Sequence, residues 1–245
     1  MIAMLFAALL VAPARAQELP RFDALIDQVK GSPAYQAVRQ ANPKLMAGDP
    51  PVSPAILAAL PARNLGHGGK PADPLTVVFL GTAQQIQTAL TGAGWTQVPM
   101  GDRAAIEKGL EDTFWHHHRP PNLPFHVFYV NGKREDMNWA MAQNLNTRHH
   151  FRLWRLPYRD DEGREIWWGS GDYDLKIRLR DFSHVVDPDV NAERLFIRDS
   201  LAQSPGVSAM WMKLLPQVKG EMVNNFGYKL RTDGNVLFVG LSTAP

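Results

Sequence analysis

The sequence predicts an α/β or α+β fold in which a mixed, mainly antiparallel sheet is flanked by helices. Residues 74–81 form a continuous apolar run rich in β-forming side chains, as expected for a buried central strand. Residues 148–155 and 164–169 predict the two strands of a hairpin, because a short charged turn lies between them. A helical, proline-rich segment is expected to precede this sheet.

The N-terminus has the features of an export signal over residues 1–16. Residues 2–11 are an apolar run, and Ala14, Arg15 and Ala16 give a small-x-small cleavage pattern before Gln17. We expect a periplasmic or secreted protein, with the signal either cleaved or retained as an anchor. The apolar run is short for a transmembrane helix, and no other stretch approaches that length, so no membrane span beyond the leader is expected.

Residues 17–70 are interpreted as an N-terminal segment before a domain at residues 71–245. Apolar side chains at helical spacing predict helix over residues 19–40, with a break at residues 31–33. The following residues are rich in proline and predict an extended strap or linker, with a short helix over residues 55–60.

A helix is predicted directly after the first strand. Thr82 and Gln85 form a capping box, in which each side chain satisfies a backbone N–H group at the start of the helix. The helix is expected to run to about Thr91, because glycines follow it.

The middle of the chain predicts one strand and a turn. Residues 124–130 are strand-like and lead into Asn131 and Gly132, which indicate a hairpin turn. Residues 135–146 are expected to be irregular. Residues 116–118 are consecutive histidines. The side chains of adjacent residues rarely converge on one metal ion, so we interpret these histidines as a polar rim and not as a metal site.

Residues 148–155 carry the most informative pattern of the sequence. As a strand, this segment sends alternate side chains to opposite faces of the sheet. One face carries His149, Phe151, Leu153 and Arg155, and the other carries His150, Arg152 and Trp154. An imidazole, a guanidinium and an indole in one row are costly to bury unless water, a ligand or partners from elsewhere satisfy them.

The C-terminal part predicts a helix and a final strand. Asp187 is expected to be the helix N-cap with Pro188 at the first helical position, and Asp189 complements the helix dipole. Residues 232–235 predict a turn into an apolar strand at residues 236–241.

Composition excludes several classes of function. A formal net charge of +2 gives no reason to expect a nucleic-acid partner. The absence of cysteine excludes disulfides, thiolate metal sites and a cysteine nucleophile.

Four blocks of sequence occur in the order typical of a known family. The blocks are residues 73–81 (DPLTVVFLG), 93–95 (AGW), 148–155 (RHHFRLWR) and 184–194 (HVVDPDVNAER). Over roughly residues 71–203 the chain resembles the LssY C-terminal domain family. The resemblance implies a bacterial envelope-associated domain that is often fused to membrane segments, including a lipid-phosphatase-like region, and a loose link to type I secretion. It implies no catalytic residues.

The chain departs from the family pattern at two points. It carries no multi-pass membrane portion, which fits a free periplasmic version. The last block often begins with paired histidines, whereas Val185 follows His184 here, and this counts against a site that needs both imidazoles.

The polar residues of these blocks are the candidates for a shared site. A histidine could act as a general acid or base, a carboxylate could orient it, and an arginine could hold an anionic group. We assign candidate catalytic roles to His150, Asp187 and His184, and candidate binding roles to Arg152, His149, Trp154, Asp174, Asp189 and Arg194.

Structural interpretations of the same residues stay open. Asp187 can serve only as a helix cap, Arg194 can pair with a nearby carboxylate, and the histidines can form a satisfied buried network. Trp167 and Trp168 face opposite ways on one strand, so one of them could be exposed for binding.

Two functions are compatible with the sequence. The first is an accessory or binding domain of the envelope that recognises an anionic, phosphate-bearing or lipid-derived group through Arg152 and the histidines. This group would belong to a small ligand or to an envelope component. The alternative is a periplasmic hydrolase with a His/Asp pair or a His/Asp site for a divalent metal. Because HExxH, GxSxG and P-loop patterns are absent, catalysis and cofactor both stay open.

Overall fold

Strands make up most of the regular structure in the part of the chain that the computed structural model describes. These residues are 42, 44–98, 127–142, 147–178 and 183–242, and they belong to one compact unit that begins at Asn42. The expected export signal, the helix over residues 19–40 and the histidines at 116–118 lie outside the described residues.

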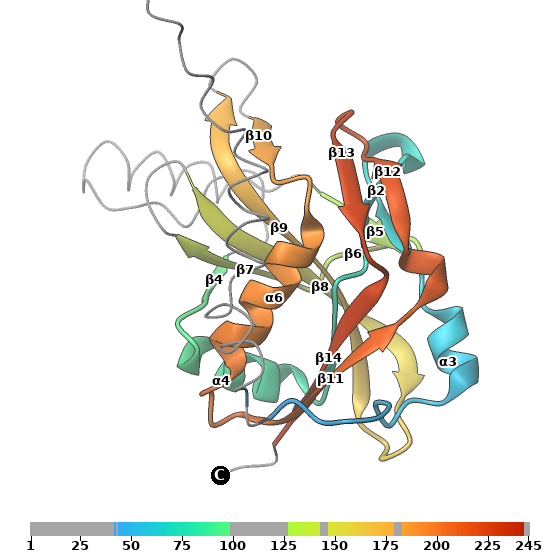
Figure 1. The fold of residues 1–245 in the computed structure, drawn as a ribbon, viewed down its shortest axis with the longest axis vertical. Helices are drawn as coiled ribbons and strands as arrows, with labels where there is room; N and C mark the ends of the chain where they lie inside the picture. Colours follow the sequence, from blue (N-terminus) through green and yellow to red (C-terminus); the bar gives the residue numbers. More distant parts are fainter. Residues whose placement is uncertain (1–41, 43, 99–126, 143–146, 179–182, 243–245) are drawn as a thin grey trace, which may run out of the picture. The chain divides into compact units, whose positions relative to one another are not determined.

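A mixed sheet of eight strands forms the centre of this unit (Figure 1). Its spatial order is β11-β14-β3-β9-β8-β7-β4, and β10 lies beside β9. Among the described strands only β14 and β3 run parallel, so the predicted mixed, mainly antiparallel sheet is confirmed. The bounds are β3 Val77–Leu80, β4 Thr96–Val98, β7 Met137–Ala142, β8 Arg148–Arg159, β9 Glu165–Arg178, β10 Ser183–Val186, β11 Val207–Leu214 and β14 Asn235–Leu241.

Two smaller sheets and three helices complete the described part. A four-stranded sheet has the order β2-β1-β5-β6, and β12 and β13 form a separate hairpin. The bounds are α3 Pro54–Ala59, β1 Arg63–Leu65, β2 Pro71–Pro74, α4 Ala83–Gly92, β5 Tyr129–Val130, β6 Lys133–Arg134, α6 Val190–Leu201, β12 Gly220–Val223 and β13 Lys229–Thr232. None of the described helices is long and apolar enough to cross a membrane.

The large sheet is buried on both faces. One face packs against α4 and α6, with Phe79, Phe151 and Trp167 among its buried side chains. The other face packs against the four-stranded sheet and α3, with Trp154 and Trp168 among its buried side chains. Both Trp167 and Trp168 are buried, so the expectation that one of them is exposed is wrong.

Local sequence signals explain several element boundaries. Thr82 and Gln85 form the predicted capping box at the start of α4. Asn131 and Gly132 both have positive φ, 51° and 75°, as a two-residue hairpin turn between β5 and β6 requires. The predicted central strand, short N-terminal helix, β8–β9 hairpin and final strand are all present.

Two predictions about local structure are wrong. Residues 137–142 are strand β7, because Trp139 and Met141 pack on the α4–α6 side while the backbone pairs with β4 and β8. Asp189, not Asp187, is the N-cap of α6, since its Oδ1 accepts from Asn191 N at 3.1 Å. Asp187 instead accepts from Asp189 N at 2.8 Å and closes the turn before the helix.

Candidate functional site

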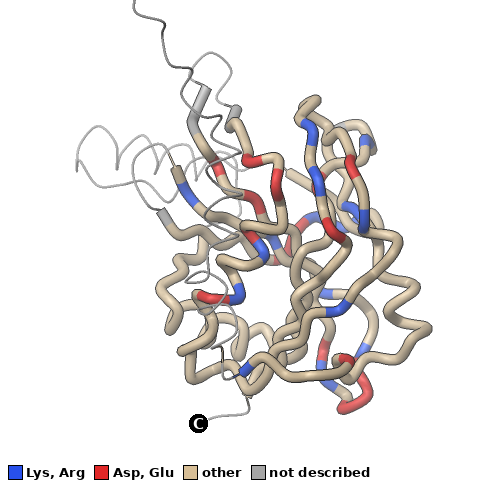
Figure 2. Tube along the Cα trace, in the orientation of Figure 1, with Lys and Arg blue, Asp and Glu red and all other residues tan. Residues whose placement is uncertain are grey.

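A row of buried polar side chains crosses the centre of the large sheet. Residues directly opposite each other in an antiparallel pair point to the same face. On β8 and β9 this register pairs Arg148 with Asp174, His150 with Asp172, and Arg152 with Ser170, and β7 adds Asn138 opposite Arg152. We call these seven residues the polar row; all are buried, and charges of both signs lie along β8 and β9 (Figure 2).

The four-stranded sheet and the β12–β13 hairpin complete the surroundings of the polar row. The Arg152 guanidinium carbon lies 4.4 Å from the centre of the Phe128 ring. Asp73 of β2 is held by Asn64, whose Oδ1 accepts from Asp73 N at 2.8 Å. Asn224 of the hairpin loop donates from Nδ2 to Asp73 Oδ1 at 3.2 Å. The polar row is therefore enclosed between two sheets.

The carboxyl groups of this region differ in their electrostatic environment. Asp174 pairs with Arg148, Nε to Oδ2 at 2.7 Å, and His150 Nδ1 lies 3.4 Å from the same oxygen. Burial raises the pKa of Asp172 well above its ordinary value, and Asp73 and Asp174 raise it further against the opposing effect of Arg152. Burial also raises the pKa of Asp73, which Arg152 and the Asn224 hydrogen bond partly oppose. Asp172 is thus a carboxyl that favours its protonated form.

Three buried atoms around Arg152 have no hydrogen-bond partner. They are Asn138 Oδ1, Ser170 Oγ and Asp172 Oδ1, and each belongs to a side chain with at most 3% of its surface exposed. Buried polar atoms in folded proteins nearly always have partners, and each one left without costs about 1–3 kcal/mol. The three atoms lie on β7 and β9, the two strands on either side of Arg152. This grouping makes the polar row the strongest candidate site in the described part of the chain.

His149 lies on the opposite face of the sheet from His150. Its Nδ1 is 2.5 Å from Glu193 Oε2 of α6, and its ring stacks on Phe196 with centroids 3.4 Å apart. Burial lowers the pKa of His149 to about 4 and raises the pKa of Glu193 well above its ordinary value. A neutral imidazole therefore lies beside a carboxyl whose protonated form is favoured by burial, away from the polar row.

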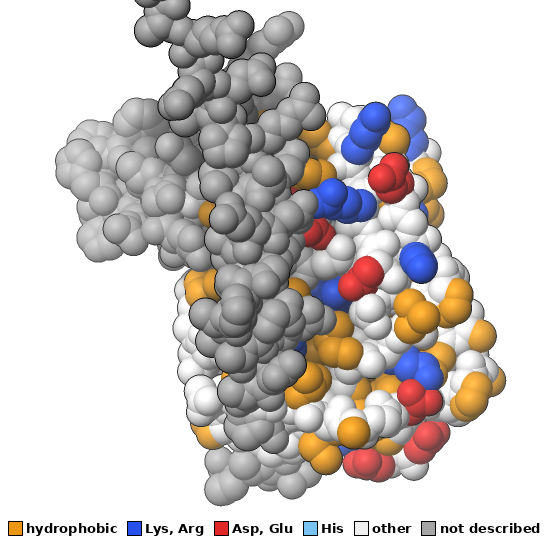
Figure 3. Space-filling view, viewed as in Figure 1, with side chains coloured by type: hydrophobic (Ala, Val, Ile, Leu, Met, Phe, Trp, Pro, Cys, Tyr) orange, Lys and Arg blue, Asp and Glu red, His pale blue; other side chains and the backbone are white. Residues whose placement is uncertain are grey.

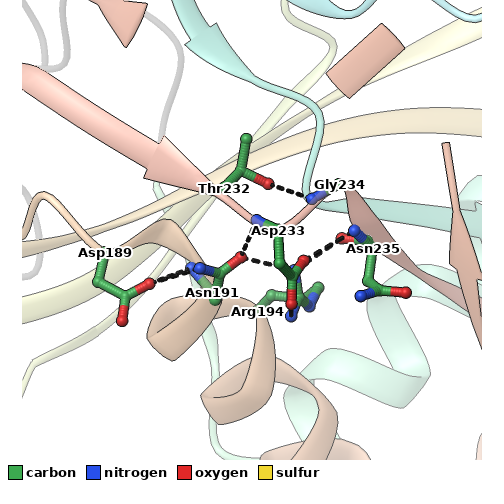
Figure 4. A network of polar contacts seen from close by, with 7 residues as sticks. All are labelled: Asp189, Asn191, Arg194, Thr232, Asp233, Gly234 and Asn235. Atoms are coloured by element: carbon green, nitrogen blue, oxygen red, sulfur yellow. Dashed lines mark hydrogen bonds and ion pairs between the residues drawn. The ribbon is translucent and has the colours of Figure 1, made fainter. Parts of the chain in front are cut away.

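Asp189 and Arg194 belong to a network at the start of α6 (Figure 4). Arg194 makes two parallel contacts to Asp233, Nη1–Oδ1 at 2.9 Å and Nη2–Oδ2 at 3.0 Å, and donates to Asn235 O at 2.7 Å. These contacts join α6 to the turn before β14. They serve the packing of the helix, as the structural interpretation of Arg194 expects.

Trp154 and the backbone of His184 also lie at separate places in the sheet. Trp154 is buried, donates from Nε1 to Lys133 O at 3.1 Å and packs edge-on against Trp168. His184 lies opposite Ile177 in β9, five residues beyond the partner of His150. At about 3.3 Å per residue this separates the two backbone positions by roughly 16 Å.

The structure thus brings together His150, Arg152 and Asp174 of the candidate residues. It places His149 with Glu193, and Asp187, Asp189 and Arg194 around the start of α6. Sequence reasoning did not assign roles to Arg148, Asn138, Ser170 or Asp73. Arg148 shares the alternate-residue pattern of His150 and Arg152 and could have been found, whereas the others depend on strand register and sheet packing.

No group of three or more histidine, aspartate or glutamate side chains within the described ranges is placed to hold a metal ion. A family model described as LssY C-terminus matches residues 57–240. No curated protein and no solved structure matches the chain. The matched range contains every residue of the polar row.

Proposed function

This chain belongs to the LssY C-terminal domain family, and we propose that its domain binds a small anionic group at the polar row. The observation that carries the proposal is the set of three buried atoms without partners, on Asn138, Ser170 and Asp172, around Arg152. A bound group that hydrogen-bonds to them would remove the cost of their burial.

The chemistry of these groups favours an oxyanion. Arg152 supplies a fixed fork of N–H donors that matches the oxygen geometry of carboxylate and phosphate. Ser170 supplies a hydroxyl donor, and the Asn138 amide can present either its oxygen or its N–H₂ group. Asp172 becomes a donor in its protonated form, which its raised pKa favours.

The charge balance supports the same ligand class. The Arg148 guanidinium is matched by Asp174 through a short, buried ion pair. Burial raises the pKa of Asp172 and of Asp73, the two carboxyl groups that interact with Arg152. These raised pKa values favour an anionic ligand over a cationic one at this place.

Binding is tested by calorimetric titration with inorganic phosphate and with glycerol 3-phosphate. Arg152→Met is expected to weaken binding roughly 10- to 100-fold, the value of a hydrogen bond to a charged group. Arg155→Met is the matched control, since Arg155 lies three residues along the same strand with its side chain 59% exposed and paired to Glu165. Ser170→Ala, which removes only the hydroxyl, should weaken binding without unfolding the domain. Equal affinities in all four proteins would contradict the proposal.

Acid-catalysed hydrolysis is the second candidate function. Asp172 has the raised pKa of a general acid and lies directly opposite His150. Release of nitrophenol from p-nitrophenyl phosphate that is lost in Asp172→Asn would favour this hydrolase. Phosphate binding without turnover favours the binding domain.

We also propose that the protein is exported. The apolar run and the small-x-small pattern in residues 1–16 support this localisation. Fractionation of bacteria that express the full chain, followed by N-terminal sequencing, should place it outside the cytoplasm and find Gln17 first if the signal is cleaved. Cytoplasmic recovery of the intact chain would contradict export.

A further inference from the structure

Exposed apolar side chains gather on the four-stranded sheet and the β12–β13 hairpin. The described part of the chain has six large hydrophobic side chains that are exposed. Four of them belong to these two elements: Leu65 (37% exposed), Tyr129 (39%), Val223 (54%) and Phe226 (43%). Their concentration at one place distinguishes them from apolar side chains scattered singly over a surface.

The four side chains belong to two elements that contact each other. Leu65 and Tyr129 are directly opposite each other in β1 and β5. The hairpin loop rests against β1, because Arg63 Nη2 donates to Val223 O at 2.7 Å and a Cβ at Gly66 would lie 2.5 Å from Asn225 Nδ2. Phe226 packs edge-on against Phe128, the residue before Tyr129, with ring centroids 6.3 Å apart.

A basic side chain lies next to each part of this area. Arg134 is opposite Tyr129 in the β5–β6 pair, and Lys229 is opposite Val223 in the β12–β13 pair. Lys70 immediately precedes Pro71, which is opposite Leu65. All three basic residues are exposed. We call the four apolar and three basic residues the apolar–basic surface.

Acidic side chains are few at this place. Glu221 of β12 is exposed and lies opposite Arg231 of β13, and the buried Glu135 pairs with Arg134, Nε to Oε1 at 3.5 Å. Figure 3 shows lysine and arginine side chains beside apolar ones at the end of the molecule formed by β12 and β13. The surface therefore combines apolar area with net positive charge.

We propose that the apolar–basic surface binds a membrane that contains anionic lipids. Aromatic and aliphatic side chains enter the boundary between headgroups and acyl chains, where they leave water. Lysine and arginine beside them bind anionic headgroups. The surface thus offers basic side chains to the anionic headgroups and apolar side chains to the acyl chains beneath them. This inference is independent of the ligand at the polar row.

A single fluorescent label tests contact at the surface itself. The chain contains no cysteine, so Leu65→Cys and Phe226→Cys each give one site for an NBD label on the full chain. Leu214→Cys is the matched control, because Leu214 is also apolar and 49% exposed but lies on β11 of the large sheet. Circular dichroism spectra of the labelled proteins establish that they are folded.

Vesicles of phosphatidylcholine with phosphatidylglycerol are expected to raise the NBD emission at positions 65 and 226 and shift it to the blue. The label at position 214 should not respond, and phosphatidylcholine vesicles alone should give a weaker response. Lys229→Gln should lower the vesicle partition coefficient about fivefold, the equivalent of about 1 kcal/mol per basic side chain near an anionic surface. NBD fluorescence reports only the surroundings of the labelled side chain. If residues 2–11 alone contacted the membrane, the labels at positions 65 and 214 would respond alike.

Three results would overturn the proposal. One is a response at positions 65 and 226 no larger than at position 214. Another is an equal response to neutral and anionic vesicles. The third is a blue shift at positions 65 and 226 that follows protein concentration without vesicles, which would identify a second copy of the chain as the occupant.

Discussion

His149 and His150 are consecutive in β8, yet their imidazoles lie on opposite faces of the sheet and meet different carboxyl groups. His149 Nδ1 is 2.5 Å from Glu193 Oε2, whereas His150 Nδ1 is 3.4 Å from Asp174 Oδ2. One small ligand cannot contact both rings without crossing the sheet. The paired histidines of this sequence therefore serve two separate environments.

The His149–Glu193 pair predicts a plateau in stability between about pH 4.5 and pH 6.5. In that range the unfolded pair holds one proton, on His149, and the folded pair also holds one, on Glu193. Below this range the unfolded Glu193 also takes up a proton. The unfolded pair then holds two protons and the folded pair holds one, so stability falls as pH falls. Above this range the unfolded state has lost its proton, and stability falls as pH rises until folded Glu193 releases its own proton at its raised pKa. The alkaline slope is at most about 1.4 kcal/mol per pH unit, whereas the whole acid fall is only about 0.5 kcal/mol, because the folded pKa of His149, about 4, is close to the ordinary pKa of an unfolded glutamate.

Urea denaturation of Glu193→Gln from pH 4 to pH 9 checks this plateau. The variant has no proton to retain at position 193, so its own stability should rise up to about pH 6.5 and stay level above it, whereas the stability of the original chain falls there. The difference curve between the two proteins isolates the pair from other titrating groups. A difference curve that is flat above pH 6.5 would show that Glu193 is ionised in the fold.

Asp172 and Asp174 are two residues apart on one face of β9, and we expect opposite effects from the same substitution. Asp174→Asn should destabilise the domain by about 3 kcal/mol at pH 8, because it leaves the buried Arg148 without its ion-pair partner. Asp172→Asn should leave stability unchanged or raise it by up to about 1 kcal/mol, since burial disfavours the Asp172 carboxylate.

The pH dependence gives this comparison a second measurement. A carboxyl whose folded pKa is raised loses stability as pH rises through that pKa, so the advantage of Asp172→Asn should grow between pH 5 and pH 8. Urea denaturation at both pH values measures it. A loss of stability in Asp172→Asn that is the same at pH 5 and pH 8 would indicate a charged Asp172 in the fold.

Much of the fold could be predicted because its signals are local. The capping box at Thr82, the Asn131–Gly132 turn and the alternation in residues 148–155 each depend on residues adjacent in sequence. Strand β7 was missed because alternation of Trp139 and Met141 with small or polar neighbours is weak over six residues. The predicted N-cap of α6 was wrong by two residues, because Asp187 and Asp189 are both of a residue type favoured at this position.

The candidate site could be predicted only in part, because it depends on contacts between distant segments. Alternation places His150 and Arg152 on one face, but the β8–β9 register decides that Asp172 and Asp174 are opposite His150 and Arg148. Nothing in the sequence near Asp73 indicates that β2 carries it toward Arg152. Likewise, α6 packing alone decides that Glu193 meets His149.

Arg194 and Arg231 both lie near the start of α6, and their burial predicts different costs of removal. Arg194→Met should destabilise the domain by about 2 kcal/mol, because the guanidinium hydrogen bonds to Asp233 and to Asn235 O are lost. Arg231→Met should cost less than about 1 kcal/mol, since its side chain is 48% exposed and lies 3.8 Å from Asp189. Thermal unfolding monitored by circular dichroism compares them, and equal costs would show that the Arg194 network does not hold α6 in place.

Gly206 and Gly92 face the same contact between α4 and the segment before β11, and alanine should act oppositely at the two positions. A Cβ at Gly206 would lie 2.8 Å from Ala89 Cα and 3.0 Å from Ala89 N, so the backbone of α4 would have to move. We expect Gly206→Ala to cost about 2 kcal/mol, as overpacking does. A Cβ at Gly92 would have its nearest neighbour at 3.7 Å, so Gly92→Ala should instead gain up to about 1 kcal/mol of helix propensity. Urea denaturation of the two variants measures both signs, and a tolerated Gly206→Ala would mean that α4 can withdraw from this contact without loss.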